Sequence, residues 1–228
     1  MNRSRSKDAQ AGFSMMELMV TMVLMLILLG IVGTLLSRSL AVRARESRRT
    51  DALTSAQAAL NVMSREIANA GFGINVNGDP TRASNGIIAA DSNDRRIRFR
   101  SNINNVGPRP APTGSTVLRT DSPGEDVTYF FDSATNSIVR YDPHGNPDGS
   151  AQTSVVVNRI SDVRFEYWDY AGASSTGTQV STPSNNTGRV RITVLVQLDP
   201  VYGQPNPSSV RFTSEVTLRN SSYMLNQY

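Results

Sequence analysis

The N-terminal part of the chain contains one long apolar run. Between positions 13 and 36 only Glu17 is charged. At a rise of about 1.5 Å per residue, a helix over this run would be about 36 Å long, which is enough to cross a bilayer. The pattern therefore predicts a membrane-spanning helix over residues 13–36.

An amphipathic stretch follows the apolar run. Its hydrophobic positions recur at alternating spacings of three and four, which predicts one apolar stripe on a continuing helix. Gly71 and Gly73 flank Phe72 and predict that the helix ends near residue 70. We expect the stripe to pack on a folded domain; its members are Leu53, Ala56, Leu60, Met63 and Ile67.

The period of the apolar positions changes to two from residue 126 onward. This alternation predicts half-buried antiparallel strands. Residues 74–124 read as long loops with short edge strands at 86–90 and 96–100, and residues 171–188 read as exposed loop. The clearest strand runs over residues 190–198, and it is expected to pair with 210–218 across a Pro-rich turn. The expected fold is α+β, with a long N-terminal helix packed on a mostly antiparallel β domain, and the simplest core is one half-buried sheet with its apolar face against the helix stripe.

Residues 1–12 form a basic leader that places its small residues before the apolar run. The leader contains three basic residues and one acid, namely Arg3, Arg5, Lys7 and Asp8, and it ends at Gly12. An ordinary secretory signal has its small-residue cleavage site after the apolar region. A basic leader, a terminal Gly, then Phe13, and Glu17 at the fifth position after the Gly resemble the type IV prepilin signal, which type IV pilins and type II secretion pseudopilins share.

This resemblance implies how the N-terminus is processed. A prepilin peptidase and methyltransferase in the membrane would cut between Gly12 and Phe13 and methylate the new amino group of Phe13. Glu17 would neutralise that amino group on a neighbouring major or minor pilin subunit during assembly. The local alternative is that Glu17 only occupies the first turn of its own helix, where the helix dipole favours an acid.

The same resemblance sets the expected location and domains. Basic residues flank both ends of the apolar run, so charge alone does not orient it. The cytoplasmic processing site implies an inner-membrane precursor with its C-terminal part outside the cytoplasm, and a pilus location after assembly. The expected segments are a leader at 1–12, a membrane and assembly helix at 13–36, an amphipathic continuation at 37–73, and a β-rich pilin domain at 74–228.

Gly30 and Gly33 interrupt the apolar helix. Each glycine costs about 1 kcal/mol relative to alanine in a helix, and small residues let apolar helices approach closely. Major pilins commonly have a helix-kinking proline at the position of Thr34. Any flexibility on assembly would therefore depend on Gly30 and Gly33, although glycine is also simply frequent in membrane helices.

The remainder of the chain points to a subgroup. The chain has no cysteine, unlike major pilins that carry a C-terminal disulfide loop. Its long loops and the helix-ending segment 63–73 look most like minor pilins of the PilW type, or the related J-type minor pseudopilins of type II secretion. From another class, a membrane-anchored binding domain that is never assembled remains an alternative. The surface ligand is not predicted.

No enzyme, cofactor or metal is expected from the residue types. The formal net charge of +4 would fall to +2 without the leader, which is too small to predict nucleic-acid binding. Oxygen-bearing residues alternate over 142–148 in a pattern faintly like a Ca²⁺ loop, but the glutamate near its end is missing and Thr153 holds that place. Trp168, Tyr167 and Tyr170 are expected in the core or on a sheet surface rather than around a ligand.

The prepilin resemblance yields a first prediction at Gly12. Gly12→Val should leave an uncut precursor, because a side chain beside the scissile bond would obstruct a peptidase that requires glycine there. Mass spectrometry of the N-terminal peptide measures the outcome, and Ala9→Val in the leader is the control. A Gly12→Val chain that still began at Phe13 would contradict the prepilin interpretation.

Overall fold

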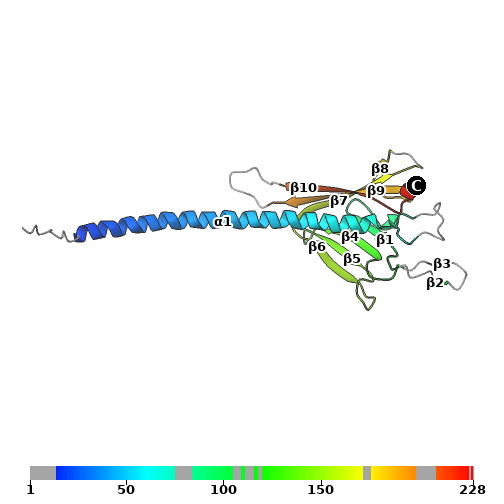
Figure 1. Ribbon diagram of the computed structural model, residues 1–228, viewed down its shortest axis with the longest axis horizontal. Coiled ribbons are helices and arrows are strands. Elements are labelled where there is room, and N and C mark those ends of the chain that lie inside the picture. Colours follow the sequence, from blue (N-terminus) through cyan, green and yellow to red (C-terminus); the bar gives the residue numbers. More distant parts are fainter. Residues whose placement is uncertain are drawn as a thin grey trace, which may run out of the picture. The chain divides into compact units, whose positions relative to one another are not determined.

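The computed structural model describes residues 14–74, 84–104, 109–110, 116–117, 120–171, 176–198, 209–225 and 227 (Figure 1). Gly12 and Phe13 lie outside these residues. The chain divides into two compact units, residues 1–48 and 49–228, which are described separately below. Helix α1, Met15–Ala68, contributes residues to both units.

Two four-stranded antiparallel sheets form most of the second unit. The first sheet has the order β1-β4-β5-β6 and contains Arg96–Arg100, Asp126–Asp132, Ser137–Asp142 and Gln152–Val157. The second has the order β10-β9-β7-β8 and contains Ser209–Thr217, Thr187–Gln197, Ile160–Asp169 and Thr178–Val180. The smaller described elements are the pair β2 (Arg109–Pro110) and β3 (Thr116–Val117), the 3₁₀ helix η3 (Ala89–Asp91) and α2 (Ser222–Leu225).

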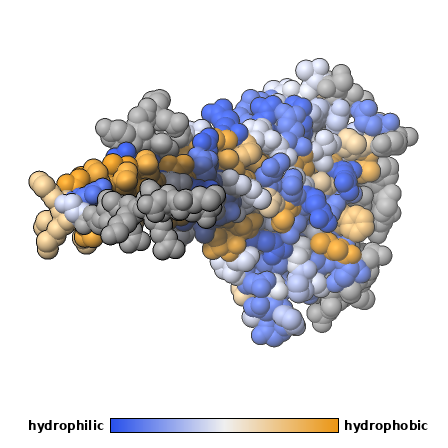
Figure 2. All heavy atoms as spheres, turned by 60° about the vertical axis from the view of Figure 1, so that its left-hand side comes forward, coloured by the Kyte–Doolittle hydropathy of each residue, from blue (hydrophilic) through white to orange (hydrophobic). Residues whose placement is uncertain are grey.

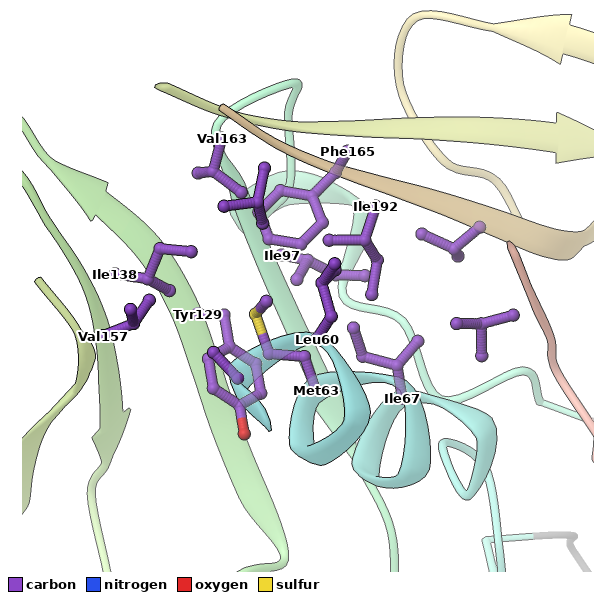
Figure 3. Close-up of a cluster of buried hydrophobic side chains, with 14 of the residues drawn as sticks. Leu60, Met63, Ile67, Ile97, Tyr129, Ile138, Val157, Val163, Phe165 and Ile192 are labelled. Atoms are coloured by element: carbon purple, nitrogen blue, oxygen red, sulfur yellow. The ribbon is translucent and has the colours of Figure 1, made fainter. Parts of the chain in front are cut away.

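The apolar stripe of α1 fills the space between the inner faces of the two sheets. Leu60, Met63 and Ile67 are buried and point toward strands of both sheets (Figure 3). They belong to one cluster with Tyr129 and Ile138 of the first sheet and with Val163, Phe165 and Ile192 of the second. Leu53, at the start of the stripe, is only partly buried. The α+β fold predicted from the sequence is confirmed.

The second sheet follows the predicted alternation closely. On β9, Val190, Ile192, Val194 and Val196 are completely buried. Their partners on β7 face the same core, with Phe165 opposite Ile192 and Val163 opposite Val194. The predicted antiparallel pairing of β9 with β10 is also confirmed. A one-residue shift in either register would turn this apolar row to the outside, so burial fixes the register.

Gly71 is required where α1 ends. Its φ is +80°, a conformation that residues with a Cβ rarely adopt. Its N–H donates to the carbonyl of Arg100 at 2.8 Å, and a Cβ added here would collide with the backbone carbonyl of Ser84. The glycine predicted as a helix stop therefore also lets the end of α1 join strand β1.

Three details differ from the sequence-based expectation. The strands form two sheets on one helix, because a single stripe can bury two apolar faces. Residues 86–90 contain one isolated bridge, between Ile87 and Phe99, followed by η3, rather than an edge strand. The expected exposed loop 171–188 contains β8 and the start of β9, with Thr187 buried. The Pro-rich turn predicted before β10 falls on residues outside the described ones.

The stripe generates a stability prediction. Leu60→Ala should lower the free energy of unfolding by about 2–4 kcal/mol, because it removes buried methyl groups and leaves a cavity. Val62→Ala, two residues away and 45% exposed, should change it by less than about 0.5 kcal/mol. Urea unfolding of the detergent-solubilised chain, followed by fluorescence of its one tryptophan, Trp168, measures both. Equal effects of the two variants would show that the stripe does not support the domain.

Candidate functional site

The first turn of α1 carries the acid that the sequence singled out. Ser14 precedes the helix; its carbonyl accepts from the Leu18 N–H at 3.1 Å and its Oγ accepts from the Met16 N–H at 3.3 Å. Glu17 lies in this first turn and is exposed. It forms no hydrogen bond or ion pair with the residues that the structure describes. The carboxylate is therefore available to a group from outside the described chain.

The surface around Glu17 is apolar on all sides of the helix. Large hydrophobic residues from Met15 to Val42 are more than half exposed, and the most apolar 18-residue window of α1 is not buried at all (Figure 2). By length and composition α1 can cross a membrane. The hydroxyls of Thr21 and Thr34 donate to carbonyls three residues earlier, at 2.9 and 2.8 Å. These polar side chains can therefore enter an apolar medium already hydrogen-bonded.

Gly30 and Gly33 lie in the same exposed segment. A Cβ added at either position would meet nothing within 4 Å. Neither glycine is thus needed for packing inside the described chain, and the helix surface is open there for close approach of another helix.

The chain has a recognisable family segment at this end. Residues 7–33 match the family described as the prokaryotic N-terminal methylation motif, the N-terminus of type IV prepilins and pseudopilins. Comparisons with curated proteins and with solved structures find no match. The motif implies processing by a prepilin peptidase. Together with the apolar helix and the antiparallel sheets, the motif makes the chain similar to type IV pilins and pseudopilins, which are generally structural subunits.

The loop compared with a Ca²⁺ site uses its principal acid for other contacts. Asp142 is completely buried, and its carboxylate accepts from the N–H groups of Gly124 at 2.7 Å and His144 at 3.0 Å. Arg140 lies 3.4 Å from the same carboxylate. Among the described residues, no group of three or more metal-ligating side chains is arranged to hold an ion. Asp142 therefore organises the turn that follows β5.

The three aromatic residues between positions 167 and 170 all pack against other residues of the second unit. Tyr167 is buried in the core, as expected from its strand position. The Trp168 ring lies on the other face of the second sheet, where Arg189 and Arg191 stack on it at 4.7 and 4.5 Å. Tyr170 stacks on Tyr223, with ring centroids 3.9 Å apart. These contacts occupy the ring faces that a ligand would need.

Sequence reasoning missed a cluster of paired charges around the buried Asp126. Asp126 begins β4 and accepts hydrogen bonds from Arg98 and Arg100, each at 2.8 Å. Arg98 also donates to Asp91 at 2.6 Å. The alternating arginines of 96–100 were a usable signal, because cations on successive outward positions of a strand favour acids on the strand beside it.

A second, partly buried network joins α1 to the first sheet. The hydroxyl of Tyr129 donates to Glu66 at 2.7 Å, and Arg140 donates to the same carboxylate oxygen at 3.1 Å. Burial, together with the Glu66 charge, raises the pKa of the Tyr129 hydroxyl. The hydroxyl therefore stays protonated and acts as a permanent donor, so the network holds the helix on the sheet.

The Asp126 carboxylate has a shifted pKa. Burial alone would raise this pKa, but the hydrogen bonds and charges of Arg98 and Arg100 outweigh burial and lower it. A carboxyl pKa that is lower in the folded chain than in the unfolded chain stabilises the fold at pH values above the unfolded pKa of about 3.9. This stabilisation is lost as the pH falls through the pKa of the folded chain.

Asp126→Asn should therefore lower the free energy of unfolding by about 1–3 kcal/mol at pH 7, because two arginines lose their charged partner. The difference from the natural chain should shrink below about pH 4, where the natural carboxyl becomes protonated. Urea titrations from pH 3 to pH 8 measure this, with the exposed Asp51→Asn as the control. A pH-independent difference would show that shape rather than charge matters at this position.

Proposed function

We propose that this protein is a minor pilin of the PilW type, a structural subunit that primes assembly of a type IV pilus or sits at its tip. The observation that carries the proposal is the methylation motif on residues 7–33, which runs into the exposed apolar part of α1, where Glu17 in the first turn has no partner among the described residues. A membrane anchor alone would need neither the motif nor an acid at the start of its apolar segment.

In this proposal the chain is processed before it assembles. Cleavage follows Gly12, Phe13 becomes the N-methylated first residue, and residues 13–36 hold the subunit in the inner membrane and later in the filament. Residues 37–73 are the amphipathic continuation, helical as far as Ala68, and the domain from 74 to 228 remains outside the cytoplasm. Gly30 and Gly33 give the helix local flexibility or close contact with neighbours when it enters the filament.

Glu17 supplies the recognition step. Cleavage creates an amino group at Phe13, and a charge without a partner is costly in apolar surroundings. A carboxylate on a neighbouring subunit relieves that cost. The exposed apolar surface around Glu17 provides the low-dielectric surroundings in which such a pair is strong.

A J-type minor pseudopilin of type II secretion is the second candidate within the class. The absence of cysteine and the helix-ending segment 63–73 are compatible with both candidates. Loss of pili or loss of protein secretion on deletion of this chain distinguishes them.

Glu17→Gln should be cut after Gly12 and inserted normally, yet its amount in sheared filaments should fall at least about tenfold relative to the inner-membrane pool, because the charge pair is lost. Glu17→Asp keeps the charge on a shorter side chain and should be less impaired. Glu46→Gln, which removes another exposed acid of α1 outside the apolar run, is the control. Normal incorporation of Glu17→Gln would refute charge pairing as the recruiting step.

A further inference from the structure

The first unit has a group of arginines directly after its apolar run. The run ends at Leu36, and the group contains Arg38, Arg43, Arg45 and Arg48. We call these four residues the arginine collar. All four are exposed on α1, and none forms a hydrogen bond or an ion pair with the residues that the structure describes. The minor pilin role assigns them no task.

The collar differs from the arginines that hold the first sheet. There, Arg98, Arg100 and Arg140 contact acids at distances between 2.6 and 3.1 Å. Glu46 is the one acid between positions 37 and 48, and it pairs with no collar arginine. Like charges that lie three positions apart on a helix, as in Arg45 and Arg48, repel each other. The collar is therefore an uncompensated positive charge that an anionic partner would stabilise.

The collar lies at the depth of a lipid headgroup layer. The hydrocarbon core of a bilayer is about 30 Å thick and the whole bilayer about 40–45 Å, so each headgroup layer is about 5–8 Å thick. At about 1.5 Å per residue, Arg38 lies about 3 Å beyond the end of the apolar run, and Arg43 about 10 Å. The long side chain of Arg43 can reach back into the layer. Arg45 and Arg48 start at about 14 and 18 Å, which leaves the layer within about one Debye length, 10 Å at 0.1 M salt.

The collar surrounds the helix and does not mark one side of it. An α-helix turns by about 100° per residue, so Arg38, Arg43 and Arg48 point in directions about 140°, 140° and 80° apart. A protein partner contacts one face of a helix, whereas lipid headgroups surround a membrane-spanning helix on every side. Cations distributed around the helix therefore favour lipid headgroups over a single protein surface as the partner.

The side-chain chemistry of the collar favours a phosphate-bearing partner. A guanidinium is planar and always charged, and it can donate two parallel hydrogen bonds to the oxygens of one phosphate. Anionic phospholipids present such a phosphate with a net negative charge. Phosphatidylcholine presents the same phosphate beside a quaternary ammonium, so its net charge is zero. The uncompensated charge of the collar therefore favours the anionic lipid.

We propose that the arginine collar binds the phosphate groups of anionic phospholipids at the C-terminal end of the membrane span. The bound headgroups neutralise the collar, and the collar in turn sets how deeply the apolar run lies in the bilayer. The inference requires that the apolar run enters a bilayer. It does not require a filament, so it holds equally for a pilin, a pseudopilin or an anchored domain.

Vesicles of defined composition test the lipid class. Because the chain has no cysteine, Ser39→Cys provides a single site for a fluorophore beside Arg38. The full-length chain would be reconstituted in equal parts of phosphatidylglycerol and phosphatidylcholine, with a nitroxide quencher on the acyl chain of one lipid or the other. Nitroxide quenching acts over short distances, so the basic leader at the other end of the span does not contribute to it.

The two quenching efficiencies give the local preference for the anionic lipid. Phosphatidylglycerol should be enriched at least about fivefold, which corresponds to about 1 kcal/mol, the contribution of one basic residue near an anionic surface. Raising the NaCl concentration from about 0.1 M to about 1 M should remove most of this enrichment, because the Debye length falls from about 10 Å to about 3 Å.

A matched pair of quadruple variants assigns the preference to the collar. The collar variant should show almost no enrichment; it carries Arg38→Gln, Arg43→Gln, Arg45→Gln and Arg48→Gln. The control variant removes the same number of charges from the second unit and should keep the enrichment. It replaces by glutamine four exposed arginines that form no ion pair with the described residues, namely Arg65, Arg159, Arg211 and Arg219. Trp168 fluorescence verifies folding, and flotation with the vesicles verifies insertion.

Two outcomes would overturn the inference. Equal quenching by the two lipids in the chain with its natural arginines would show that the collar does not select anionic lipid, and its counter-charge would then have to come from an acidic protein surface. Equal loss of enrichment in the two quadruple variants would show that the preference follows total charge and not the collar. Because neither measurement involves filaments, the proposed function would stand in both cases.

Discussion

The contact between the α1 stripe and the two sheets is the constraint on which the rest of the second unit depends. Neither sheet can bury its apolar face alone, and Leu60, Met63 and Ile67 supply the surface that both sheets share. Removing that surface would expose two faces at once, because no other described helix of comparable length is present to cover them. The hydrogen-bond networks of Glu66 and Asp126 add polar contacts that hold strands of the first sheet in their orientation.

The same helix must satisfy two different surroundings, and its sequence changes accordingly. Up to Leu36 it is apolar on every side, which suits lipid or the helices of other subunits. From Leu53 it is apolar on one stripe, which suits a single protein core. Charges follow the same division: in the second unit the buried acids Asp126 and Asp142 contact arginines, whereas Glu17 has no such partner among the described residues. An acid at the start of an apolar helix is favoured by the dipole of its own helix, and it can also pair with a positive charge from another molecule.

The helix, its end at Gly71 and most strands were predictable because each depends on a local periodicity. The number of sheets was not, because strands of both sheets show the same alternation and only tertiary packing assigns them. Strand β8 has a polar sequence typical of a loop and becomes a strand by pairing with β7. The ion pairs of Asp126 were not predictable because its arginine partners are 26 and 28 positions away in the sequence. The roles of Gly12, Phe13 and Glu17 were predictable only by resemblance, and they stay predictions.

The family motif covers residues 7–33, and the comparisons find no match for the β domain. The difference has a physical basis. A prepilin helix is processed, crosses a membrane and packs among other subunits, so it tolerates few sequences and its motif is recognisable. A β domain needs only two apolar sheet faces and a stripe between them, and many sequences meet that requirement. What distinguishes one subunit from another must then lie on surfaces that the core does not determine, namely loops, outer faces and sheet edges.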